Sequence, residues 1–180
     1  MMTDQPITHS LLTPDERSAI AEIEATTSIL SLVTRLTQMR FAAIAKFTES
    51  EWIVCSTYDE SELEIEAGDS LPVEITLCSD FKTDPQALLL PDIRLSPRHH
   101  NRPVVRQFGL ESYAGVPIFL PDGTLYGALC ALDSRPVALK NPDIAETLGL
   151  FARLIGCIFF SSGSALELSD TEPRLEHSKA

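Results

Sequence analysis

Two apolar runs separated by a turn dominate the pattern of hydrophobic and polar positions along the chain. The runs cover residues 112–119 and 124–133, and each has the length of one strand. Pro121-Asp122-Gly123 stands between them, and Asp-Gly between two apolar runs is a strong hairpin signal. The pattern therefore predicts an antiparallel strand pair over residues 112–133.

Small and cyclic residues interrupt these two runs. Gly115 and Gly127 lie inside them, where glycine marks a bulge or a close approach by another backbone or a ligand. Pro117 has no backbone N–H, so its strand is expected to lie at an edge or an irregularity at that position.

A helix is predicted near the start of the chain. Thr13 suits the N-cap, Pro14 the first helical position, and Glu16 completes a capping box. Apolar residues then recur with helical period to about Met39. The segment 26–28 (Thr-Thr-Ser) weakens helix propensity, so one kinked long helix and two short helices both fit.

A second helix is predicted near the end. Asn141-Pro142-Asp143 has the order of cap, proline and acid that starts a helix. Apolar positions continue to about Phe160, and Ser161-Ser-Gly-Ser is expected to end the helix. The expected organisation is a flexible N-terminus over 1–12, a single domain over 13–162 and a flexible acidic tail over 163–180.

Composition and charge exclude several classes of partner. The 180 residues are 44% hydrophobic and 22% charged, which is typical of a soluble domain. The net charge of −12 argues against nucleic acid and against anionic membrane surfaces, which both need clustered Lys and Arg. With neither a leader sequence nor an apolar run long enough to span a membrane, a cytoplasmic location is expected.

The hairpin carries a resemblance to a known family. The pattern Tyr113-x-Gly-Val-Pro-Ile, a turn, then Leu125-Tyr-Gly-x-Leu-Cys-Ala-Leu-Asp133 resembles the last two core strands of GAF sensor domains. Residues 40–47 and 52–58 resemble the opening strand pair of these domains. Residues 71–78 resemble their middle helix and residues 88–93 their third strand. Residues 97–108 resemble the covering loop with its short helix. The resemblance covers roughly residues 25–162 and is greatest to the GAF modules of bacterial histidine kinases and diguanylate cyclases, which act in two-component and related signal transduction.

The resemblance implies an α+β fold. Its GAF/PAS-like centre would be an antiparallel sheet of five or six strands with helices on both faces, and the N- and C-terminal helices packed together. It also implies a ligand cavity between the sheet and residues 92–108.

Catalytic motifs are not found in the sequence. It contains no GxxxxGK[ST] phosphate loop, no GxSxG elbow and no HExxH metal motif. The densest polar cluster is Asp92–Arg102, where Arg94 and its neighbours can hold a carboxylate or phosphate, or can pair with the many acidic side chains. His99 or His100 can face the cavity, or both can be plain loop residues. We expect a binding domain without catalytic or metal-binding residues.

The expected ligand-binding residues come from the cover, the hairpin and the second predicted strand. They are Tyr58, Asp92, Arg94, His99, His100, Phe108, Tyr113 and Cys130.

The cysteines carry two open interpretations. Cys55, Cys78, Cys130 and Cys157 are scattered among apolar residues, as buried cytosolic thiols usually are. Alternatively, Cys55 or Cys130 has a redox role if it faces a cavity.

Comparison with ligand-binding GAF domains limits which cofactors the chain can bind. Residues 91–118 resemble the bilin-binding part of cyanobacteriochromes, whose attachment cysteine would fall at about His100. No cysteine lies between Phe81 and Leu129, so covalent bilin attachment is excluded and only non-covalent tetrapyrrole binding stays open, through Asp92 and the two histidines. The cyclic-nucleotide signature is absent, and a free methionine sulfoxide reductase, which needs clustered cysteines, is a minor alternative.

The expected function is a sensory or regulatory GAF domain. It would bind an unidentified small molecule and signal to a partner protein through its terminal helices. Residues 14–38 and 142–160 are expected to form a homodimer, although both helices can also simply cover the sheet of a monomer. The alternative function is a ligand-free dimerisation scaffold. A cavity of a few hundred cubic ångströms would favour the sensor, and a filled one the scaffold.

Overall fold

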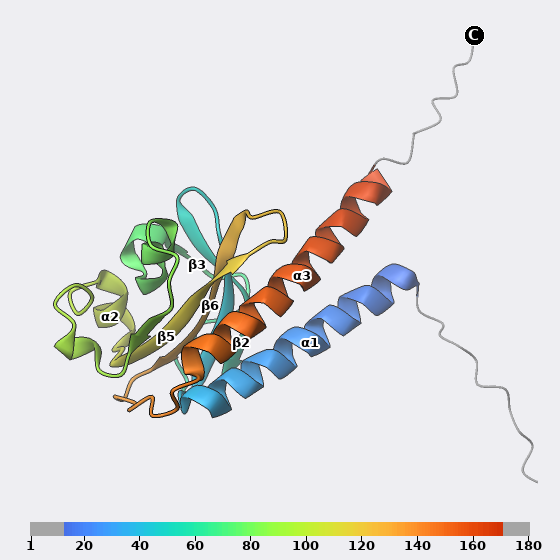
Figure 1. The fold of residues 1–180 in the computed structure, drawn as a ribbon. Helices are drawn as coiled ribbons and strands as arrows, with labels where there is room; N and C mark the ends of the chain where they lie inside the picture. Colours follow the sequence, from blue (N-terminus) through green and yellow to red (C-terminus); the bar gives the residue numbers. More distant parts are fainter. Residues whose placement is uncertain (1–12, 171–180) are drawn as a thin grey trace, which may run out of the picture.

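The computed structural model describes residues 13–170, and its centre is a six-stranded antiparallel sheet (Figure 1). The strand order is β3-β2-β1-β6-β5-β4. The strands are β1 Phe41–Phe47, β2 Glu51–Asp59, β3 Ser70–Pro72, β4 Leu88–Leu90, β5 Ser112–Phe119 and β6 Leu125–Asp133. The helices are α1 Pro14–Thr37, η1 Val73–Ile75, η2 Leu77–Lys82, η3 Ile93–Leu95, α2 Pro103–Phe108 and α3 Ile144–Asp170.

Helices cover both faces of this sheet, as the GAF resemblance predicts. On one face α1 and α3 lie together and run past the edge of the sheet (Figure 1). The opposite face is covered by η2, the loop around η3, and α2. Because successive strand residues point to opposite faces, each central strand contributes to two separate cores.

The predicted hairpin is confirmed as β5 and β6, which pair from Ser112↔Asp133 to Phe119↔Leu125. Pro117 also fits the prediction, because β4 pairs with β5 only over Tyr113 to Gly115 and leaves the outer side of Pro117 without a strand partner. A Cβ on Gly127 would collide with the carbonyl oxygen of Ala45 in β1. The expected close approach of another backbone is therefore present at this glycine.

The start of α1 has the predicted capping box. The Thr13 hydroxyl accepts from the amide of Glu16 at 3.2 Å, and the Glu16 carboxylate accepts from the amide of Thr13 at 2.8 Å. The structure decides between the two expected arrangements, because a single helix runs from Pro14 to Thr37. Thr26 does not end it, since its hydroxyl donates back to the carbonyl of Glu22 within the same helix.

Two predicted elements differ in the structure. The middle segment 71–78 is not one helix, because β3 pairs with β2 and the chain then turns through η1 and η2. The last helix does not end near Phe160 but continues to Asp170. Ser and Gly each lower helix stability by about 1 kcal/mol or less, and Ser162 is anchored by a hydrogen bond of 2.6 Å to Glu22 of α1. The start of the expected flexible tail 163–180 is therefore helical, and its remainder 171–180, like the expected flexible segment 1–12, lies outside the described residues.

One helix differs from the expectation that no apolar run in the chain is long enough to span a membrane. Residues Ile144–Ser162 of α3 are long and apolar enough to cross a membrane, with a mean hydropathy of 1.6. Five residues on one side of this stretch are nevertheless buried: Ile144, Leu148, Ala152, Ile155 and Gly156. The apolar character of α3 therefore has a function within the fold.

Candidate functional site

A small cavity lies between the sheet and the η2–α2 layer. Its volume is about 20 Å³, enough for roughly one water molecule. The lining is almost entirely apolar and comes from both the strands and the cover: Trp52, Ile65, Leu71, Thr76, Leu77, Cys78, Val104, Leu110, Tyr113, Cys130 and Leu132. Five of these side chains carry a polar atom or a thiol: Trp52, Thr76, Cys78, Tyr113 and Cys130. The Thr76 hydroxyl donates to the carbonyl of Val73 at 2.7 Å.

The indole of Trp52 supplies an unused donor. Trp52 is only 3% exposed, and its buried Nε1–H makes no hydrogen bond among residues 13–170, although it lies close enough to the Cys78 thiol to help lower the pKa of that group. An indole N–H can only donate, and leaving such a group buried and unpaired costs about 1–3 kcal/mol. A ligand or water with an acceptor atom would remove this cost.

Two thiols and a phenol form the polar end of the cavity. The hydroxyl of Tyr113 lies 3.0 Å from the sulfur of Cys78, and both groups are buried. Interactions with Cys130 and Tyr113 lower the pKa of Cys78. For Cys130, the interaction with Cys78 and burial both raise the pKa. Burial also raises the pKa of Tyr113, so the phenol is neutral at physiological pH. Gly115 makes room for this ring, because a Cβ there would collide with it.

A hollow on the surface adjoins the cavity. It has a volume of about 240 Å³ and is lined in part by Phe108 and Gln107 of α2. Trp52, Ile65 and Leu71 line both spaces and therefore form the wall between them. A rearrangement of these three side chains would join the buried cavity to the surface.

An ionic network fastens the cover of the cavity. Asp80 of η2 accepts from Arg102 at 2.6 Å and from the Nε2 of His99 at 2.8 Å. Because Asp80 is an acceptor, His99 carries its proton on Nε2 and accepts from the Ser96 hydroxyl at Nδ1, at 2.7 Å. Although burial alone would raise it, the hydrogen bonds from Arg102 and His99 lower the pKa of Asp80. This network ties η2 to the loop that precedes α2.

The structure brings together only some of the expected site residues. Tyr113 and Cys130 line the cavity, and Phe108 lines the adjoining hollow. His99 is buried close to them but is occupied by Asp80 and Ser96. Tyr58 packs in the core on the opposite face of the sheet and donates to Glu60 at 3.0 Å.

The other three expected residues have local partners. Asp92 and Arg94 form an ion pair of 2.8 Å at the surface, where Arg94 is 65% exposed. The Nδ1 of His100 lies 2.9 Å from the carbonyl oxygen of Ser96. None of the three lines the cavity, so their polar groups serve the conformation of the cover.

Three site residues were not anticipated from the sequence. Trp52 and Cys78 line the cavity, and Asp80 fastens its cover. Asp80 is 19 residues from His99 and 22 from Arg102 along the chain, so no local motif joins them. The single Trp of the chain, inside an apolar strand, was a usable signal for Trp52. Of the two cysteines for which a redox role was left open, Cys130 faces the cavity and Cys55 does not. Cys157 is exposed, so it is not the buried thiol that the sequence predicted.

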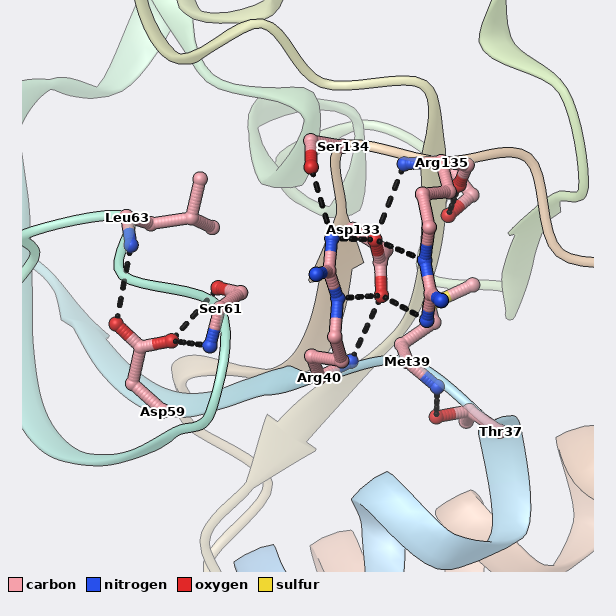
Figure 2. A network of polar contacts seen from close by, with 10 residues as sticks. Thr37, Met39, Arg40, Asp59, Ser61, Leu63, Asp133, Ser134 and Arg135 are labelled. Carbon is pink, nitrogen blue, oxygen red and sulfur yellow. Dashed lines mark hydrogen bonds and ion pairs between the residues drawn. The ribbon is translucent and has the colours of Figure 1, made fainter.

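A second ionic network closes the far end of the hairpin (Figure 2). The Asp133 side chain is fully buried and accepts from the backbone amide of Arg40 at 2.9 Å and from its guanidinium at 2.8 Å. Arg135 donates to the same carboxylate at 3.3 Å. Although burial would raise it, these hydrogen bonds lower the pKa of Asp133 to about 2. The network joins the end of β6 to the start of β1.

Several solved structures share this fold. The blue-light absorbing PixJ GAF domain of Thermosynechococcus elongatus has a TM-score of 0.60 and 11% identity, over 87% of this chain and 97% of its own. A far-red absorbing protein with bound biliverdin has a TM-score of 0.62 and 16% identity, over 83% of this chain and 98% of its own.

A third structural relative is an enzyme. The free methionine-R-sulfoxide reductase of Neisseria meningitidis has a TM-score of 0.61 and 16% identity, over 84% of this chain and 86% of its own. No curated protein matches this chain in sequence. The GAF domain family matches residues 22–158, which include every strand of the sheet and the cavity beneath the cover. The chain therefore belongs to the GAF domain family.

Proposed function

We propose that this GAF domain is a sensor whose ligand occupies the cavity beneath η2 and α2 together with the adjoining hollow. The observation that carries the proposal is the buried Nε1–H of Trp52, which lacks a partner within residues 13–170 and lies in the wall between the two spaces. The cavity fits a small, largely apolar molecule with one acceptor atom, whereas the hollow, which Glu64, Asp69, Ser70 and Gln107 also line, fits a polar part of that molecule. Because the cavity holds about 20 Å³, such a ligand enters only when the wall or the cover moves.

The sheet offers a direct route for the signal. Tyr113 and Cys130 face the cavity, whereas Ala114, Leu129 and Ala131, their neighbours in sequence, pack in the core beneath α1 and α3. A shift of β5 or β6 on ligand binding is therefore transmitted to the terminal helices without any intervening segment. The packing of these helices is the two-state element that a ligand can bias.

A homodimer through α1 and α3 is part of the proposal. Seven large hydrophobic residues are exposed among the described residues, and five of them lie on these two helices. Those five are Ile23, Leu32, Leu150, Leu154 and Phe160. A second copy, or the matching helices of a signalling protein, would bury this surface. Such pairing, together with the core packing of α3, supports a cytoplasmic protein.

A ligand-free dimerisation scaffold is the second candidate. It is favoured by the volume of the cavity, which is about 20 Å³ rather than the several hundred typical of ligand sites. In that case the terminal helices carry the function and the cavity is a packing defect.

A reductase is a further candidate because Cys78 and Cys130 share the cavity and one structural relative is such an enzyme. Reduction of free methionine sulfoxide, with dithiothreitol as the reductant, tests it. Turnover that is lost in Cys130→Ser but kept in Cys55→Ser would support it, because Cys130 faces the cavity and Cys55 does not.

The sensor is tested by native mass spectrometry and an absorption spectrum of the protein purified from its own host. A bound mass on the protein is expected, and a visible band would identify a non-covalent tetrapyrrole. Trp52→Phe removes the unused donor and should reduce the fraction of ligand-bound protein.

Tyr126→Phe is the matched control. It deletes the polar group of an aromatic side chain but keeps the ring, and it does so on the opposite face, where Tyr126 packs against Phe159 with ring centroids 5.0 Å apart. It should leave the bound fraction unchanged. A colourless dimer without any bound mass would reject the sensor in favour of the scaffold.

A further inference from the structure

A groove lies at the base of the two terminal helices, away from the cavity. It has a volume of about 730 Å³ and is formed by residues 35–38 at the end of α1 and 135–141 between β6 and α3. We propose that this groove binds a small polyanion that carries carboxylate or phosphate groups. The site is independent of the ligand proposed for the cavity.

The charge of the groove points to an anion. Arg35, Arg135 and Lys140 line it, and none of its lining residues is Asp or Glu. This is unusual in a chain with 26 acidic and 14 basic residues. Within residues 13–170, neither Arg35 nor Lys140 has a carboxylate within 4 Å. The groove therefore concentrates positive charge that the protein itself does not neutralise.

The nearby carboxylate does not cancel this charge. Asp133 is shared between Arg40 and Arg135, and the charge of Asp59 also acts on Arg40, so Arg135 has no carboxylate to itself among the described residues (Figure 2). Arg135 is 57% exposed and can donate to a ligand while it still contacts Asp133. Its guanidinium is thus oriented before a ligand arrives, which lowers the entropic cost of binding.

The backbone on both sides of the groove is fixed. The amide of Val137 donates to the carbonyl of Pro91 at 2.9 Å, and the hydroxyl of Ser112 donates to the carbonyl of Arg135 at 2.7 Å. The end of α1 would repel an anion if its carbonyls were free. Two of its last four carbonyls are occupied, because the backbone amide of Gln38 donates to that of Thr34 and the side chain of Gln38 to that of Arg35.

The arrangement selects a multivalent ligand. Guanidinium groups bind carboxylate and phosphate through paired hydrogen bonds, and an ammonium adds a third point charge. One segment supplies Arg35 and the other Arg135 and Lys140, so a ligand with two or more anionic groups bridges them. Such a bridge would fix the end of α1 against the segment that leads into α3.

Isothermal titration of the full chain with pyrophosphate, and separately with citrate, tests the proposal. Saturable binding of at least one probe is expected, weaker at about 300 mM NaCl than at about 50 mM because salt screens exposed charges. Binding of pyrophosphate but not citrate would indicate that the ligand carries phosphate groups. Binding of citrate but not pyrophosphate would indicate that it carries carboxylate groups. In the double variant Arg35→Gln/Lys140→Gln, the affinity should fall about tenfold or more.

The control is Arg17→Gln/Arg106→Gln, which changes the net charge equally at two exposed positions outside the groove. It should bind the probes as the unmodified protein does. Because both pairs of residues are exposed, all variants should fold, and thermal unfolding checks this. Equal weakening in the two double variants, or no heat with either probe at millimolar concentration, would overturn the proposal.

Discussion

Single residues show how tightly this fold couples backbone and side chains. Asp133 is the clearest case, because one fully buried carboxylate satisfies the backbone of Arg40 and two guanidinium groups. A carboxylate whose pKa is lower in the folded than in the unfolded chain stabilises the fold above its unfolded pKa. This stability is lost as the pH falls towards its folded pKa.

Asp133→Asn should therefore change the acid response of the protein. The pKa of about 2 against an ordinary value of 3.8 corresponds to a contribution of about 2 kcal/mol, present above pH 4 and lost between pH 4 and 2. Urea unfolding at pH 6 should show the variant to be less stable, and the difference should shrink by about 2 kcal/mol at pH 2. A constant difference at all pH values would contradict this role of Asp133.

Gly127→Ala should be among the more harmful single-methyl changes in the sheet. Its Cβ would collide with the carbonyl oxygen of Ala45, so β1 and β6 would separate locally, at a cost of about 1–3 kcal/mol. Gly149→Ala is the control, because no atom lies within 4 Å of the added Cβ and alanine favours the helix. Urea unfolding of both variants measures the difference, and equal stability of the two would refute the collision.

At the scale of elements, the cover of the cavity depends on ion pairs more than on regular structure. The segment between η2 and α2 contains only a short strand and a short 3-10 helix. Asp80 links both ends of that segment through His99 and Arg102.

Asp80→Asn should loosen the cover without unfolding the sheet. Hydrogen exchange in η2 and α2 is expected to accelerate about tenfold, while the central strands β1 and β6 keep their protection. Asp92→Asn breaks a comparable Asp–Arg pair, but at the surface and within one turn, and should leave the exchange of η2 and α2 unchanged. Uniform acceleration across the sheet would show that Asp80 supports the whole fold instead.

The whole molecule has one face that the described residues leave uncovered. Leu154 is 55% exposed on α3, in line with Leu150, one turn earlier in the same helix. We expect a dimer at micromolar concentration by light scattering, and a monomer after Leu154→Glu, because a buried unpaired charge opposes association.

Leu95→Glu serves as the control for this experiment. Leu95 is 80% exposed, but it lies in η3 on the opposite face of the sheet. The variant should stay dimeric. A monomeric mass for the unmodified protein would end the homodimer proposal and leave a partner protein as the candidate for this face.

Local sequence determined the elements whose signals lie within a few residues. The capping box at Thr13, the Asp-Gly turn and Gly127 each specify backbone geometry directly, and the structure contains all of them. Gly115 instead makes room for the ring of Tyr113 in its own strand, which is neither the bulge nor the approach of a backbone or ligand that was predicted. The hairpin motif was also sufficient for the family, because its close contacts are a property of the shared fold.

Tertiary structure alone decided the site. Trp52, Cys78 and Cys130 come from three separate segments, and only the order of strands in the sheet and the path of η2 bring them to one cavity. The volume of that cavity depends on how side chains pack, which no local pattern encodes. Tyr58 shows the same limit, since the face that a strand residue occupies depends on what covers each side of the sheet.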